Sequence, residues 1–192
     1  MSEHGLGTSA LKGLCVLIQA LRNLEVGELA VARIREGMGL LNDFKSPFTQ
    51  EKAEEVVSQF RFDYGRKQGA DTAYPLFLQQ CIEYLHQSGK SDLQLVLIIS
   101  DGRINKKQVR PYLLKAQQVL FLCIILDNPA ASILAMKSTT FLETPTGPQV
   151  EFKPYLEDFP FAHYIVLENP NLLVHSLCDV IRQWFEFVKD LS

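Results

Sequence analysis

One run of residues, Leu95–Arg103 (Leu-Val-Leu-Ile-Ile-Ser-Asp-Gly-Arg), constrains the fold more than any other stretch. Its uncharged, mostly aliphatic residues predict a strand buried on both faces, as in a parallel sheet. The run ends at Ser100-Asp101-Gly102, which predicts a tight turn at the carboxyl end of the strand. Ligands of open α/β sheets bind at that end, so Asp101 is a candidate functional residue. The alternative is that Asp101 only stabilises the turn.

Strand and helix patterns alternate along the rest of the chain. Further strands are predicted over residues 28–34, 39–44, 119–126 and 164–167, and a short helix near 130–136. Amphipathic helices are predicted to begin at Thr8 or Ser9, Thr49, Asp71, Asn105 and Asn171. The alternation predicts an α/β fold with a doubly wound, mostly parallel sheet flanked by helices, and one antiparallel edge.

The organisation predicted is a single domain over residues 1–192, since no linker forces a division. Residues 138–161 contain prolines and show little periodicity, so they are either a functional insertion or a poorly ordered loop.

Composition narrows the class of protein. The net charge of −3 argues against a general nucleic-acid binder, because no basic excess is present to neutralise phosphates. No secretion signal or membrane-length apolar run is visible, which favours an intracellular protein without membrane contact. The cysteines are scattered without metal-site spacing, which favours buried free thiols over disulfides or a metal site: Cys15, Cys81, Cys123 and Cys178.

Two oxygen-bearing side chains are predicted where loops meet helices at the top of the sheet. The Asp101 carboxylate and the Thr72 hydroxyl are hard donors of the kind that Mg²⁺ prefers, although such residues at helix starts are more often caps. Just after Asp101 lies a set of basic residues, here called the basic rim: Arg103, Lys106, Lys107 and Arg110. The basic rim is either a solvated helix face or a surface that steers an acidic partner.

The order of elements resembles a von Willebrand factor A-type domain, and several segments narrow the resemblance. Over essentially its whole length the chain is similar to the carboxyl-terminal MIDAS domain of the midasin family, the AAA+ ATPases of large ribosomal subunit assembly. The segments that carry this similarity are Glu25–Val31, Leu122–Pro129, Ser132–Lys137, Tyr155–Phe161 and Arg182–Glu186.

The resemblance implies a function for the site. In this family an Asp-x-Ser-x-Ser triplet, a threonine and an aspartate bind a Mg²⁺ ion, and the threonine and aspartate match Thr72 and Asp101. The family domain captures ubiquitin-like domains of pre-60S assembly factors, whose acidic side chain completes the metal shell, in the nucleolus and nucleoplasm. By this resemblance the chain is a binding module rather than an enzyme, and residues 138–161 are a candidate second contact surface.

The sequence departs from the family at its start. No Asp-x-Ser-x-Ser triplet is present, and the first strand of the fold, which is central in A-type domains, is missing. Unpaired backbone groups on the flanking strands would cost ~1–3 kcal/mol each if buried. We therefore expect either that residues outside this chain supply the strand or that the flanking strands close on each other. The corresponding hypothesis is that the chain is a fragment or truncated product of a longer family member.

Two other functions stay open. One is a degenerate A-type domain that scaffolds partners without metal. The other is a nucleotide-using α/β enzyme, which needs a glycine-rich loop directly after a strand. The segment Gly5–Ala10 matches the glycine pattern, but no strand is predicted before it.

Overall fold

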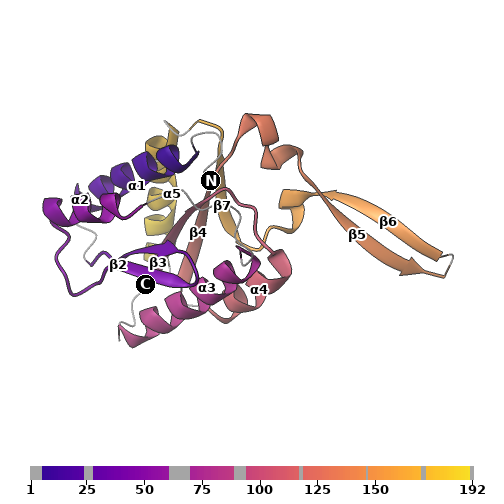
Figure 1. The fold of residues 1–192 in the computed structure, drawn as a ribbon, viewed down its shortest axis with the longest axis horizontal. Helices are drawn as coiled ribbons and strands as arrows, with labels where there is room; N and C mark the ends of the chain where they lie inside the picture. Colours follow the sequence, from indigo (N-terminus) through magenta and orange to yellow (C-terminus); the bar gives the residue numbers. More distant parts are fainter. Residues whose placement is uncertain are drawn as a thin grey trace.

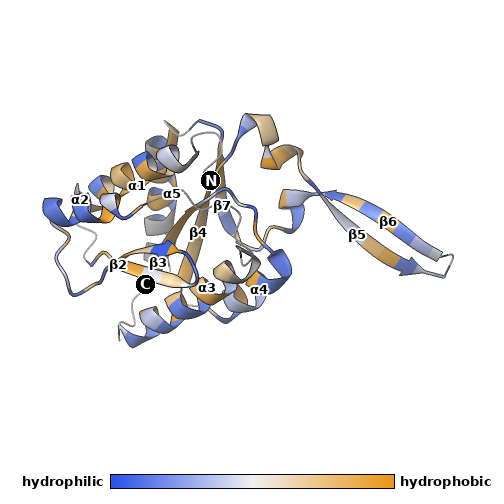
Figure 2. Cartoon of the chain, in the orientation of Figure 1, coloured by the Kyte–Doolittle hydropathy of each residue, from blue (hydrophilic) through white to orange (hydrophobic). Residues whose placement is uncertain are grey.

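The computed structural model describes residues 6–23, 28–60, 70–88, 94–116, 119–145, 147–169 and 172–190. At its centre is a parallel sheet with the strand order β3-β4-β7, formed by β3 (Gln94–Ser100), β4 (Val119–Leu126) and β7 (His163–Leu167) (Figure 1). The middle strand β4 is almost wholly buried and stands out as continuously hydrophobic in Figure 2. The α/β class is confirmed, and the Leu95 run forms the strand β3. Its burial is met only in part, because Ile98 and Ser100 are buried and the other residues of β3 are half-buried.

Helices cover both faces of this sheet, which is the doubly wound arrangement that the sequence predicts. On one face, α1 (Leu6–Asn23) and α5 (Leu173–Asp190) pack with alternate β4 residues such as Leu122 and Ile124. On the other face, α3 (Ala70–Gln87) and α4 (Lys106–Lys115) pack with the intervening residues, such as Cys123. Successive strand residues point to opposite faces, so one aliphatic strand serves both cores.

A second, antiparallel sheet is formed by β1 (Val31–Ile34) and β2 (Met38–Asn42). Among the described residues this hairpin is separate from β3, so the prediction that it forms an edge of the main sheet is wrong. Its Val31 packs with Ile18 of α1 and with Val56 of α2 (Gln50–Ser58), while Ala32 and other residues pack against the α3 side. Helix α2 begins at the predicted cap, where Thr49 Oγ1 accepts a hydrogen bond of 3.3 Å from Lys52 N.

The segment after β4 corrects a second prediction. In place of a helix near residues 130–136 there are two 3-10 segments, η2 (Pro129–Ala131) and η3 (Ile133–Ala135). They are separated because Ser132 is extended at ψ 135° and its side chain caps η3. The buried Asp127 carboxylate also fixes this turn, since it accepts a hydrogen bond of 2.8 Å from Ile133 N and another from Ser132 Oγ.

The described part of residues 138–161 is largely regular, which contradicts the poorly ordered loop, while the alternative of a functional insertion stays a prediction. Strands β5 (Lys137–Thr144) and β6 (Gly147–Pro154) form a long antiparallel hairpin that projects from the rest of the molecule (Figure 1). A 3-10 segment, η4 (Tyr155–Asp158), follows it. In a two-stranded ribbon each strand has an unpaired outer edge, which tolerates the prolines that obscured the pattern. One face of this ribbon carries exposed Phe141 and Phe152.

None of the helices within the described ranges has the length and hydrophobicity needed to cross a membrane. All four cysteines are free thiols, as predicted, but Cys15 and Cys178 are exposed and only Cys81 and Cys123 are buried.

Candidate partner-binding site at the end of β3

Asp101 lies directly after β3, at the end of the parallel sheet where its strands have their carboxyl ends. Its side chain is half-exposed, and Oδ1 accepts a hydrogen bond of 3.1 Å from Arg103 N, so it also stabilises the turn. The next residue must be glycine, because Gly102 has a φ of +73° and a Cβ there would lie 2.7 Å from Ile133 Cδ1. The sequence therefore located the turn and its carboxylate correctly, and the role of Asp101 in binding stays a prediction.

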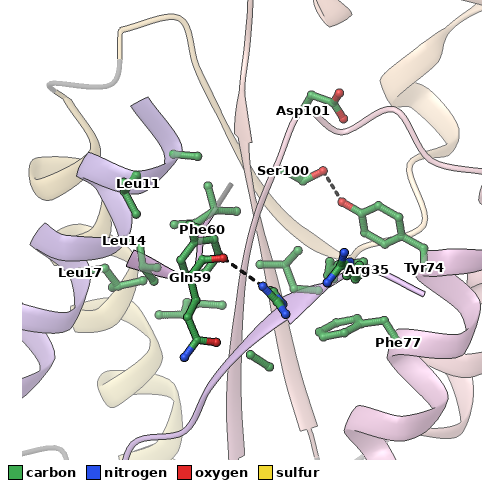
Figure 3. A pocket seen from close by; sticks show the side chains of 17 residues that line it. Leu11, Leu14, Leu17, Arg35, Gln59, Phe60, Tyr74, Phe77, Ser100 and Asp101 are labelled. Carbon is green, nitrogen blue, oxygen red and sulfur yellow. Dashed lines mark hydrogen bonds between the residues drawn. The ribbon is translucent and has the colours of Figure 1, made fainter. Parts of the chain in front are cut away.

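The beginning of α3 lies beside this turn. Tyr74 Oη donates a hydrogen bond to Ser100 Oγ, which also accepts one of 3.1 Å from Gly102 N (Figure 3). Burial raises the pKa of Tyr74, so its hydroxyl remains a donor at neutral pH. Thr72 is in the first turn of α3, two residues before Tyr74, but its side chain is outside the described residues. Its proximity to the Asp101 carboxylate therefore stays a prediction.

The basic rim is used largely within the molecule. Arg103 Nη2 donates to Ala131 O, and Arg110 Nη2 donates to Asp158 O at 3.3 Å. Lys106 Nζ donates to the carbonyl of Tyr155 and lies 4.1 Å from the centroid of its ring. Lys107 is exposed on α4. Three of these four basic side chains therefore hold the segments on either side of the β5–β6 hairpin, and a role in steering partners stays a prediction.

Tyr155 is the residue that sequence reasoning missed. Its hydroxyl accepts a hydrogen bond of 3.1 Å from Ile104 N and lies 2.9 Å from Ile104 O and 3.1 Å from Gly102 O. It thereby holds the loop that follows Asp101. Burial raises the pKa of Tyr155, which keeps the donor proton in place. In the sequence it is marked by its position directly after a proline and as the first residue of the Tyr155–Phe161 segment, which carries part of the family similarity.

The described residues at this site could supply only part of a Mg²⁺ shell. Mg²⁺ needs six oxygens in near-octahedral geometry. Within the described ranges no group of three or more His, Cys, Asp or Glu side chains is placed to hold a metal. Ser100 Oγ already accepts two hydrogen bonds, which occupy both of its lone pairs. Asp101 therefore has the right chemistry, but an ion here would also need Thr72, water and a partner's oxygens.

A cavity of about 370 Å³ lies beside Ser100 and Asp101, between β3 and the β1–β2 hairpin; we call it the β1–β3 cavity. Two runs of consecutive residues line it, Ala32–Arg35 and Leu97–Asp101. Leucines of α1 project toward it from one side, and Tyr74 and Phe77 of α3 from the other (Figure 3). The strands β1 and β3 therefore do not close on each other. Closure was one of the two alternatives expected from the sequence, and the structure contradicts it.

Comparison with known proteins gives a consistent relationship. No protein-family model matches the chain. Midasin from Dictyostelium discoideum is 30% identical over 202 residues, covering 98% of this chain and 3% of that protein. Midasin from Giardia intestinalis is 30% identical over 190 residues, covering 93% of this chain and 4% of that protein.

Among solved structures, an uncharacterized membrane-spanning protein from Vibrio fischeri aligns with 91% of this chain and 84% of its own. The TM-score is 0.27 and the identity 12%, which is too little similarity to support an inference. The family assignment therefore rests on the sequence similarity to the two midasins. The chain is a midasin-type segment, related to midasin along nearly its whole length and equivalent to 3% to 4% of the length of those relatives.

Proposed function

We propose that this chain is a protein-interaction module of a midasin-type ribosome-assembly ATPase and acts in the nucleus. It binds ubiquitin-like domains of pre-60S assembly factors through an acidic side chain of the partner and a shared Mg²⁺. The observation that carries the proposal is the half-exposed Asp101 carboxylate at the carboxyl edge of the sheet, in a chain related to midasin over 98% of its length.

Each residue around Asp101 has its own role in the proposed binding. Asp101 provides negative charge, and Thr72 would add a neutral oxygen from the start of α3. Tyr74 and Tyr155 fix the two ends of the turn through Ser100 and Ile104. A bound Mg²⁺ supplies the positive charge that lets two carboxylates share one site. Because the described residues supply few ligands, metal and partner are expected to bind together rather than one after the other.

The test uses the 192-residue chain and an immobilised ubiquitin-like domain from a pre-60S assembly factor. We expect retention in Mg²⁺ and its loss in EDTA, and Asp101→Ala should reduce retention in Mg²⁺ to the EDTA level. The matched control is Asp179→Ala, which removes the same charge from a half-exposed site on α5 and should bind normally. Retention that is unaffected by EDTA or by Asp101→Ala would contradict the proposal.

A metal-free scaffold is the second candidate function. Two observations favour it. Ser100 Oγ already accepts two hydrogen bonds, and the described residues contain no group of three or more His, Cys, Asp or Glu side chains placed to hold a metal. Calorimetric titration distinguishes the two candidates. Heat that appears when Mg²⁺ is added to the chain mixed with the ubiquitin-like domain supports the bridge, whereas partner binding with no Mg²⁺ dependence supports the scaffold.

A further inference from the structure

Two short turns, η2 and η3, carry the chain from the end of β4 to the β5–β6 hairpin (Figure 1). The exposed residues of these turns all have apolar side chains, and we call them the η2–η3 patch: Pro129, Ala130, Ala131, Leu134 and Ala135. The largest of these side chains, Leu134, is 53% exposed. A single exposed leucine is common, whereas neighbouring exposed apolar residues are typical of a contact surface.

The η2–η3 patch is attached to the turn after β3. A Cβ on Gly102 would lie 2.7 Å from Cδ1 of Ile133, so the two segments are in contact. Arg103 Nη2 also donates a hydrogen bond to the carbonyl of Ala131. Ile133 is 1% exposed and packs inward, while the next residue, Leu134, is exposed. A molecule bound at the turn after β3 therefore has the Leu134 side chain as a neighbour.

Hydrogen bonds within the chain fix the shape of the η2–η3 patch. The buried Asp127 carboxylate accepts a hydrogen bond of 2.8 Å from Ile133 N and another from Ser132 Oγ. Ser132 Oγ in turn accepts one of 3.1 Å from Leu134 N, and Ala135 N donates one of 3.2 Å to Ser132 O. A surface that is ordered in this way loses little conformational freedom when a partner binds, which favours affinity.

The charges around the η2–η3 patch select its partner. Asp127 is the one charged residue between residues 127 and 136, and it is buried, so the patch itself is uncharged. Beyond the turn after β3 lie exposed basic residues, Arg103 and Lys107. An apolar centre with charges at its rim is the usual composition of a protein interface. The complementary surface has an apolar side chain next to acidic ones, and the partner proposed for Asp101 already presents an acidic side chain.

We infer that the η2–η3 patch is a second contact of the Asp101 site, which receives an apolar side chain that the ubiquitin-like partner carries beside its metal-bound acidic residue. This inference rests on the function proposed above. Leu134 is the specificity-determining residue of the contact, because it has the largest exposed side chain of the patch. Mg²⁺ can bridge Asp101 to many acidic surfaces, and Leu134 selects those that also place an apolar residue beside the acid.

The first test measures retention of the 192-residue chain on the ubiquitin-like domain in Mg²⁺. Leu134→Asn removes the apolar side chain without adding charge and should weaken binding about fivefold to tenfold, because a half-exposed leucine is no longer buried by the partner. Leu134→Met stays apolar and should bind within about twofold of the unmodified chain. The matched control, Leu114→Asn, changes a leucine that is 69% exposed in the last turn of α4 and should bind normally.

A second measurement separates direct contact from an effect on the turn after β3. In the unmodified chain with labelled leucine methyl groups, the Leu134 resonances should shift when the ubiquitin-like domain is added in Mg²⁺, and those of Leu114 should not. In Leu134→Asn without partner, the amide resonances of Gly102 and Arg103 should keep their positions, because the variant removes a contact surface and leaves the turn intact. Movement of these amides would mean that Leu134 acts through the turn, and would overturn the inference.

The other outcomes distinguish the inference from the proposed function. Equal binding of Leu134→Asn, or Leu134 methyl resonances that ignore the partner, overturns the inference, while retention that is lost in EDTA and in Asp101→Ala still supports the function. Retention that EDTA leaves unchanged but Leu134→Asn weakens contradicts the metal bridge and supports the contact at the patch. Leu134 resonances that shift with the concentration of the chain alone would show that a second copy covers the patch, which overturns the inference. No retention at all overturns both.

Discussion

A single hydroxyl, that of Tyr155, joins the segment after the β5–β6 hairpin to the turn that carries Asp101. Tyr155→Phe keeps the ring and its contact with Lys106 but removes the hydroxyl, leaving Ile104 N without this acceptor. We expect the free energy of unfolding to fall by about 1–2 kcal/mol, since one half-buried donor loses its partner. Amide hydrogen exchange at Ile104 should accelerate. Denaturant unfolding and exchange measured by NMR check both effects.

The matched control is Tyr164→Phe, because Tyr164 is 39% exposed and the described structure records no hydrogen bond of its hydroxyl. It should change neither the free energy of unfolding nor the exchange at Ile104. If Tyr155→Phe loses stability but exchange at Ile104 is unchanged, the hydroxyl does not hold this loop.

The cysteines differ in reactivity for a physical reason. Burial raises the pKa of Cys81 to about 11 and that of Cys123 to about 12, whereas Cys15 and Cys178 are exposed. A raised pKa lowers the thiolate fraction, and the thiolate is the form that reacts. At pH 8 we therefore expect rapid alkylation of Cys15 and Cys178 and slow alkylation of Cys81 and Cys123, followed by mass spectrometry. In denaturant all four should react alike, and rapid labelling of Cys123 in the folded chain would contradict this burial.

At the same scale, sequence reasoning located Asp101 but could not find the hydrogen bonds that its basic neighbours make within the molecule. A carboxylate after an aliphatic run is a local signal, so Asp101 was predictable. The ties of Arg103 and Lys106 are not local, because their acceptors, Ala131 and Tyr155, are 28 and 49 residues away. No pattern of charge along the chain reveals such contacts, which is why the basic rim was predicted to be a solvated or partner-steering face.

Among the elements, the β5–β6 hairpin is closed at its base. Tyr155 N donates a hydrogen bond of 2.9 Å to Met136 O, and Ser138 is paired with Lys153. Replacing residues 139–152 with an Asn-Gly turn should therefore leave a short hairpin. The side chains removed are exposed for the most part, so we expect the free energy of unfolding to change by less than ~1 kcal/mol.

The control for this deletion is Phe161→Ala, at a residue that is 2% exposed and packs against Phe121 and Phe159, and this change should cost ~3–5 kcal/mol. Denaturant unfolding compares the two variants. Loss of the cooperative transition in the shortened chain would mean that the hairpin contributes to the core.

The elements also show where sequence patterns succeed. Strand β4 was predictable because burial on both faces demands continuous aliphatic residues, and β3 has the same pattern although most of its residues are half-buried. The β5–β6 hairpin was not predictable in this way, because its side chains are mostly exposed and no hydrophobic core selects their sequence pattern. Phe141, Val150 and Phe152 do share one face, with Phe141 opposite Val150, and the strands are joined by Pro145-Thr146 just before Gly147, the first residue of β6. That alternation is the signal that was available.

Across the whole molecule, α1 and α5 meet at a contact that depends on Gly13. A Cβ at this position would lie 2.4 Å from Cδ2 of Leu173, which is 1% exposed. Gly13→Ala improves helix propensity by ~1 kcal/mol, but overpacking costs ~1–3 kcal/mol, so we expect a net loss of about 1 kcal/mol. In a Leu173→Ala background the clash is absent, and the same change should stabilise the chain.

A double-mutant cycle by denaturant unfolding measures this coupling. Additive effects of Gly13→Ala and Leu173→Ala would show that the two helices do not approach as closely as the structure has them.

The closed base of the hairpin has a mechanical consequence. A force on its tip reaches the body of the protein at Met136 and Tyr155, and Tyr155 passes it to the turn after β3 through one hydroxyl. Because the β5–β6 hairpin is long and is held only at its base, a small displacement at the base corresponds to a large displacement at the tip. A load on the ribbon would therefore be felt at the turn that carries Asp101, although the two lie in different parts of the chain.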